Sequence, residues 1–160
     1  GAGSDDLSGD GGDDILIGSD IVDLDSGAID LLRGLIDVDD LTGPLLVLDE
    51  ETGPDTGTDA LFGGAGEDDF IVGVDWINQT GPSNAPQIFD FTPSEDVLVI
   101  GFDADDGAPT LTYASPFSDQ VEIYANGRLV VTLGGDGEPL SIAQVRQVVT
   151  VAPINPPDGL

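Results

Sequence analysis

The residues best suited to chemistry lie in the stretch 63–71, GGAGEDDFI, where glycines precede three acidic residues and two apolar ones. Glycine loses more conformational entropy on folding than any other residue, and adjacent carboxylates repel each other. Something must offset both effects. Calcium binds roughly six to eight oxygen ligands, many of them carboxylate and carbonyl oxygens. The stretch therefore predicts a tight turn that binds a hard cation.

The same pattern occurs four times. Residues 63–71 fit the nonapeptide G-G-x-G-x-D-x-U-x, in which U is a large apolar residue. Residues 9–17 and 1–8 also match, the latter lacking only the first glycine, and residues 54–62 match the later half. The copies form two tandem pairs, separated by residues 18–53. Four copies in phase, each with an apolar U position, favour a repeat over a flexible Gly/Asp-rich linker.

These nonapeptides resemble the repeats-in-toxin, or hemolysin-type, calcium-binding repeat. The motifs that carry the resemblance cover residues 1–17 and 54–103. The resemblance implies a parallel β-roll in which each repeat contributes one turn and one short strand. It also implies that the repeat Asp and the turn carbonyls bind calcium between alternate repeats, while the U residues fill the core.

The resemblance implies specific ligand pairs if residues 18–53 loop out. Asp5 should face Asp59 across one calcium ion, and Asp14 should face Asp68 across another. The turn carbonyls that complete these sites would come from Gly1, Gly3, Gly12, Gly57, Gly64 and Gly66. The apolar ladder would be formed by Leu7, Leu16, Leu61 and Phe70. Residues 18–53 number four times nine, so they could instead hide decayed coils, and the pairing would then fail.

The segment between the repeat pairs is acidic and apolar at once. Ile29, Leu32 and Ile36 have helical spacing, and residues 45–48, LLVL, are typical of a short strand. Residues 23–27 resemble the start of an EF-hand loop without its closing Glu. A cation site, a solvated acidic face and a partner-binding surface are all compatible with this composition.

Residues 87–103 alternate and are rich in β-branched side chains, which predicts two strands around a Pro-Ser turn. The segment also resembles the I-x-D-F…D-x-L-x-I stretch that commonly follows the last repeat of the family. Its Asp90 is predicted either to close the last calcium site or to cap a turn. Trp76, just before this segment, is expected to pack against the end of the repeats, with ligand stacking as the alternative.

The remaining sequence predicts a hairpin and a helix. Residues 121–133 contain Asn126-Gly127, which suits a type I′ turn. Residues 141–149 predict a short helix capped by Ser141, followed by a Pro-rich extended end. The expected fold class is all-β: a short parallel β-roll with calcium-binding turns in residues 1–73, with an insertion at 18–53. Antiparallel strands and one short helix in residues 74–160 would cap it.

Composition excludes several functions. The 160 residues include 32 acidic residues and 3 basic ones, all arginines, so the net charge is −29. Such a charge repels nucleic-acid phosphates and anionic membrane surfaces, and no apolar run is long enough to span a membrane. The chain has no His and no Cys, which removes the usual catalytic triads and zinc sites. We therefore expect a protein that is not an enzyme, with calcium as its cofactor.

Two functions agree with this composition. The first is a bacterial extracellular calcium-binding module, secreted by the type I route, that folds when calcium binds outside the cell. The second is a calcium-dependent structural or adhesive protein that self-associates in a surface layer, filament or matrix. A simple calcium buffer would not need an ordered second half. Because the chain begins with Gly1, we expect it to be a processed piece or an excised fragment.

Overall fold

The structure is a computed structural model of the chain, and it describes residues 4, 6–18, 58–73, 85–104, 106–135 and 137–155. Within these residues it contains two β-sheets and one short helix. In spatial order, the six-stranded sheet comprises β1 (Asp6–Ser8), β3 (Ala60–Phe62), β5 (Gln87–Ile88), β9 (Arg128–Gly134), β8 (Gln120–Ala125) and β7 (Leu111–Phe117). The four-stranded sheet comprises β10 (Val149–Asn155), β6 (Val97–Asp103), β4 (Asp69–Val72) and β2 (Ile15–Ile17).

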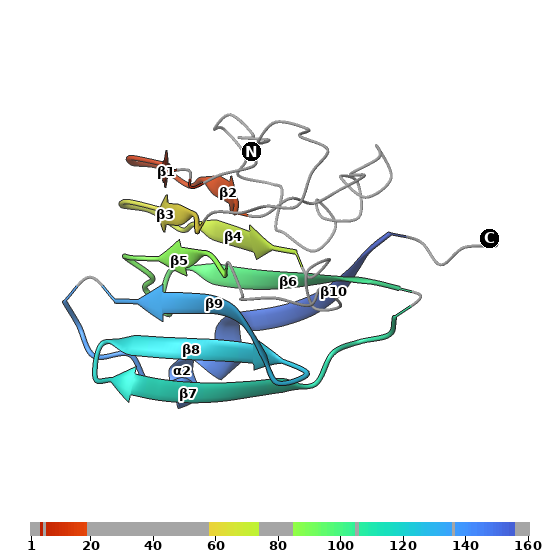
Figure 1. Cartoon of the computed structure of the whole chain (residues 1–160). Helices are drawn as coiled ribbons and strands as arrows, with labels where there is room; N and C mark the ends of the chain where they lie inside the picture. The colour runs from red at the N-terminus through yellow and green to blue at the C-terminus, as the bar shows by residue number, and fades with distance from the viewer. Residues whose placement is uncertain are drawn as a thin grey trace.

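The chain alternates between the two sheets over its first six strands. The odd-numbered strands β1, β3 and β5 pair in parallel in one sheet, and β2, β4 and β6 pair in parallel in the other. The first six strands stack in chain order, with β1 and β2 at one end of the molecule, whereas β7 and α2 (Ile142–Val148) lie at the other end (Figure 1). Each repeat therefore adds one strand, to the two sheets in turn.

The predicted fold class, a short parallel β-roll with a separate antiparallel cap, is wrong. The structure has two sheets that together hold parallel and antiparallel strands. Parallel pairing continues beyond the repeats, because β5 pairs with β9 and β6 pairs with β10. The antiparallel strands β8 and β7 extend the six-stranded sheet instead of covering its end. The reason is non-local: β9 and β10 come from distant parts of the chain, and no local pattern reveals which edge they join.

The apolar positions of the repeats form the predicted ladder. Leu7, Leu16, Leu61 and Phe70 are all buried in one cluster between the sheets. Phe70 also contacts Phe91, with ring centroids 5.9 Å apart. Full burial of side chains of this size contributes about 1.5–3 kcal/mol each, so the ladder is a main source of stability.

The two repeat pairs are direct neighbours. Leu7 pairs with Leu61 in one sheet, and Leu16 pairs with Phe70 in the other. No other strand lies between β1 and β3 or between β2 and β4, which is the adjacency that the ligand pairing required. The looping out of residues 18–53 stays a prediction, since residues 19–53 lie outside the described part of the chain.

The predicted hairpin and helix are both present. Asn126 and Gly127 have φ angles of 51° and 85°, as a type I′ turn requires, and they join β8 to β9. Ser141 caps α2, and its side chain accepts a hydrogen bond from the Gln144 N–H. Residues 87–88 and 97–103 form strands β5 and β6, although the two lie in different sheets.

Several sequence predictions lie outside the described residues. They are the helical spacing around Ile29–Ile36, the strand at 45–48, the loop at 23–27, and the packing of Trp76. The division of the chain at residue 74 stays a prediction. None of the helices among the described residues is long and apolar enough to cross a membrane.

Candidate metal centre

Three turns lie side by side at one end of the sheets, and we call them the turn stack: residues 9–14, 63–68 and 89–96. They are adjacent because the strands that they connect pair in register. Backbone bonds tie the turns together: the Gly9 N–H donates to the Phe62 carbonyl and the Gly12 N–H donates to the Ala65 carbonyl, both at 2.9 Å. The turn stack therefore brings acidic segments that are far apart in sequence into contact.

Two glycines of the middle turn are required by their surroundings. Gly64 and Gly66 have φ angles of 98° and 146°, where L side chains are strained. A Cβ on Gly64 would collide with the carbonyl oxygen of Asp10, and one on Gly66 would collide with the carbonyl oxygen of Gly12. The first turn thus directs two carbonyl oxygens into space that only glycine leaves open.

A column of three carboxylates runs through the turn stack at equivalent positions: Asp14, Asp68 and Asp96. The Asp14 N–H donates to Asp68 Oδ1 at 3.0 Å, and the Asp68 N–H donates to Asp96 Oδ1 at 3.2 Å. Each carboxylate of the second and third turns thus accepts a backbone hydrogen bond from the preceding turn. These hydrogen bonds fix the spacing between the three turns.

The second carboxylate oxygens of Asp14 and Asp68 are different, because both are buried and have no hydrogen-bond partner. The Asp68 side chain is only 1% exposed. Each unpartnered oxygen points back toward the first glycine of its own turn: a Cβ on Gly9 would lie 2.7 Å from Asp14 Oδ2, and one on Gly63 would collide with Asp68 Oδ2. A buried carboxylate oxygen without a donor is energetically unfavourable unless a cation or proton compensates.

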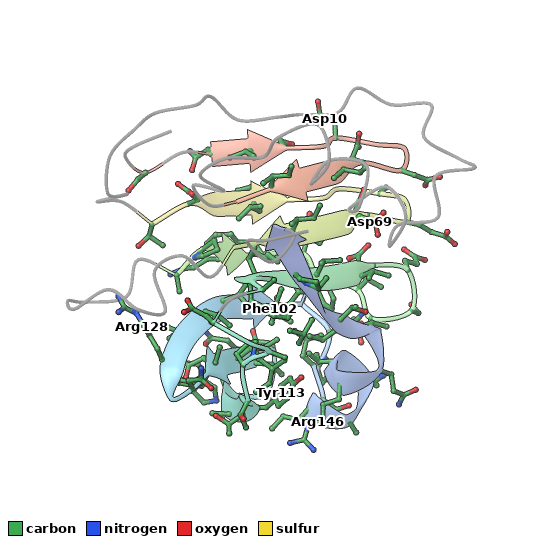
Figure 2. All side chains as sticks on the ribbon, turned by 90° about the vertical axis from the view of Figure 1, so that its right-hand side faces the viewer. Asp10, Asp69, Phe102, Tyr113, Arg128 and Arg146 are labelled. Atoms are coloured by element: carbon green, nitrogen blue, oxygen red, sulfur yellow. The ribbon has the colours of Figure 1, made fainter. Side chains whose placement is uncertain are left out.

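The charged side chains of the turn stack are all acidic. Burial raises the pKa of Asp68, and the negative charges of Asp14, Asp90 and Asp13 add to this effect. Burial also raises the pKa of Asp96 to about 6. The described arginines lie elsewhere, and Arg146 is at the opposite end of the molecule from Asp10 (Figure 2). In the described part of the chain, these carboxylates therefore have no nearby basic side chain.

Asp90 has the geometry of a turn cap. Its Oδ1 accepts a hydrogen bond from the Gly63 N–H at 3.0 Å, and its Oδ2 accepts one from the Gly64 N–H at 2.9 Å. Of the two roles predicted for Asp90, this contact describes capping of the middle turn. Its role as a calcium ligand stays a prediction.

The donor set is suited in kind to a hard cation, since the turn stack offers carboxylate and carbonyl oxygens. Across the residues that the structure describes, however, no group of three or more acidic side chains is arranged to hold a metal ion. A cation here would take the unpartnered oxygens of Asp14 and Asp68 together with turn carbonyls. The predicted pair Asp14 and Asp68 is brought together, as are the glycine turns of Gly12, Gly64 and Gly66.

Of the other predicted pair, Asp5 and Asp59, only Asp59 lies among the described residues. Gly1, Gly3, Asp5 and Gly57 lie outside the described residues. Asp59 is buried, 3% exposed, and its carbonyl accepts a hydrogen bond from the Gln87 N–H at 2.8 Å. A site between Asp5 and Asp59 stays a prediction.

Sequence reasoning gave no site role to two acidic residues of the turn stack, although one of them, Asp96, is the second Asp of the I-x-D-F…D-x-L-x-I stretch. Asp96 continues the column of Asp14 and Asp68, and Asp13 accepts a hydrogen bond from the Glu67 N–H at 3.0 Å. A detectable pattern existed for Asp96: like Asp14 and Asp68, it lies two residues before a buried apolar residue, here Leu98. Asp13 had no comparable pattern, because an acidic residue at that place is equally compatible with solvent.

Comparison of the chain with protein-family models, curated proteins and solved structures gave no match. The similarity to the hemolysin-type repeat therefore rests on the motifs alone and stays a prediction.

Proposed function

We propose that this chain is a secreted calcium-binding module that folds when calcium binds outside the cell. The observation that carries the proposal is the pair of buried, unpartnered oxygens of Asp14 and Asp68 in adjacent turns. In metal-free solution these carboxylates must be buried against mutual repulsion. A bound calcium ion would supply the missing partner, so calcium affinity would become folding free energy.

The linkage between binding and folding gives the expected size of the effect. A ligand that binds only the folded state stabilises it by about 2.7 kcal/mol when its concentration is 100 times its dissociation constant. Two such sites would contribute about 5 kcal/mol, which is comparable to the marginal stability of a small domain, roughly 5–15 kcal/mol. Low calcium inside a cell would leave the chain unfolded for export, and higher calcium outside would fold it.

The test is a calcium titration followed by circular dichroism, with Asp68→Asn as the variant. Asn keeps the shape of Asp68 but removes the charge, so the calcium midpoint for folding should rise at least severalfold. Asp119→Asn is the matched control, because Asp119 is exposed in the turn between β7 and β8. Equal midpoints for the two variants would contradict the assigned site, and folding that is indifferent to chelator would contradict calcium binding altogether.

The alternative function, a self-assembling structural or adhesive protein, is supported by the outermost strands at the β1 and β2 end of the two sheets. Among the described strands, β1 and β2 each pair on one side only. Such edges can template the addition of strands from another chain. Light scattering after size exclusion separates the two functions. At about 5 mM calcium, which exceeds the dissociation constants typical of extracellular calcium modules, a monomer supports the folding module, and calcium-driven growth supports assembly.

A further inference from the structure

The four-stranded sheet has a second apolar surface that faces away from the main core. We call it the outer patch, and it consists of Ile15, Ile17, Ile71, Val99 and Ala152. Strand alternation separates it from the ladder, because Leu16 and Phe70 point inward while their neighbours point outward. In register, Ile17 pairs with Ile71 and Ile71 pairs with Val99, so the patch is continuous across three strands.

The outer patch is as inaccessible to solvent as the main core. Its five side chains are between 1% and 5% exposed. A sheet with one wet face alternates apolar and polar residues, whereas parallel strands buried on both faces are apolar throughout. Strand β2 has the second pattern, ILI with all three residues buried, although it is the outermost strand of its sheet.

The described elements do not account for this covering. All five members of the outer patch belong to strands of the four-stranded sheet. The one helix among the described residues, α2, contributes its buried Val145 to the main core instead. The six-stranded sheet likewise packs on the inner face, through residues such as Leu61 and Ile123.

We propose that the outer patch is the docking surface for the chain's own connecting segment, residues 19–57. The segment begins where β2 ends, directly beside Ile17, and returns to the sheets at residue 58. Its 39 residues can span up to about 130 Å when extended, whereas four strands are only about 15 Å wide. Reach is therefore no obstacle.

Composition also favours this occupant. Fifteen of the 39 residues between 19 and 57 are Ala, Val, Ile or Leu, and they include the runs Leu31–Leu32 and Leu45–Leu48. The same segment carries 11 acidic residues and one Arg. Such a segment can cover an apolar sheet with its aliphatic residues and present its acidic residues to solvent. The proposal does not depend on calcium binding.

Cysteine accessibility tests the proposal, since the natural chain contains no cysteine. Val99→Cys reports on the outer patch, Val131→Cys reports on the main core, and exposed Thr112→Cys gives the unprotected rate. In the full chain, a maleimide should react with the first two at least on the order of 100-fold more slowly than with the third. Replacing residues 20–56 with a Gly/Ser linker should make Val99→Cys reactive and leave Val131→Cys protected.

Other results would overturn the proposal. Protection of Val99→Cys that is lost on dilution, together with a dimer by light scattering, would identify a second copy as the occupant. Protection that persists in the monomeric deletion variant would assign the covering to another part of the chain. Rapid labelling of Val99→Cys in the full chain would show that nothing covers the patch.

A second variant serves if the deletion unfolds the protein and exposes Val131→Cys. In the full-length chain, all four residues of Leu45–Leu48 or all four of Ile29, Leu31, Leu32 and Leu35 are changed to Ser. At least one replacement should raise the labelling rate of Val99→Cys by tenfold or more while Val131→Cys stays protected. If neither replacement changes the rate, the segment is not the occupant.

Discussion

Substitution of Gly64 by Ala tests the geometry on which the candidate metal centre depends. Gly64 has φ +98°, and a Cβ there would collide with the backbone carbonyl of Asp10 in the neighbouring turn. Gly12 provides a matched control in the same turn stack: its φ is +121°, but a Cβ would meet nothing within 4 Å. The two substitutions share the conformational strain and differ in the collision.

The expected losses follow from these two contributions. Positive φ costs an Ala residue about 1–2 kcal/mol, and the lower entropy of the unfolded Ala chain offsets about 0.4–1 kcal/mol of this. Gly12→Ala should therefore lose about 1 kcal/mol. Gly64→Ala adds an overpacking penalty of about 1–3 kcal/mol, because the obstructing atom belongs to the backbone and cannot rotate away. Its total loss should be about 2–4 kcal/mol.

The assay is urea unfolding in excess calcium, followed by circular dichroism, with the slopes compared to confirm equal exposure of surface. Gly137→Ala is a second control, since its φ is +76° in open space outside the repeats. Equal losses for Gly64→Ala and Gly12→Ala would refute the close approach of the two turns. They would also remove the structural basis for a shared site between Asp14 and Asp68.

Three further predictions concern pH, capping and core packing. In chelator, the contribution of Asp96 to the free energy of unfolding should fall by about 2 kcal/mol as pH rises from 4 to 7, after allowance for solvent screening. The reason is that its folded pKa of about 6 exceeds its ordinary 3.8. Thermal unfolding across this pH range should show the loss, and a rise in stability would contradict the prediction. Ser141→Ala should cost about 1 kcal/mol by removing the α2 cap, with exposed Thr112→Ala as control, and an unchanged midpoint in urea would contradict the capping contact. Phe70→Ala should cost about 3–5 kcal/mol because Phe70 is fully buried between the sheets, and unfolding that matches the wild type would refute the assigned core.

The repeat motif predicted the local features of the fold well. Glycine and Asp at fixed spacing identified the turns, and the U positions identified Leu7, Leu16, Leu61 and Phe70 as core. Asn126-Gly127 and Ser141 were equally informative, because a type I′ turn and a helix cap depend on residues adjacent in sequence. Each of these patterns is complete within about ten residues, so tertiary contacts were not needed to recognise it.

Pairing between distant strands could not be predicted in the same way. β10 joins β6 across more than forty residues, and its sequence VTVAPIN is apolar enough for a core strand in either sheet. The outer patch was missed for a related reason. Ile15 and Ile17 were compatible with a solvated face of the repeats, and only their burial shows that both faces of the sheet are covered.

Adjacent residues Asp68 and Asp69 explain why this acidic repeat is suited to a cation-dependent fold. Asp68 ends the turn and is buried, whereas Asp69 begins β4 and pairs with Ile15 beside the outer patch. Burial is the largest cause of the raised pKa at both positions, and at Asp69 it raises the pKa to about 6. Burying these carboxylates in their charged form therefore costs folding free energy. Protonation relieves this cost at Asp69 only below about pH 6. The proposed calcium site at the Asp14–Asp68 pair therefore predicts that calcium and protons compete for the same folded state.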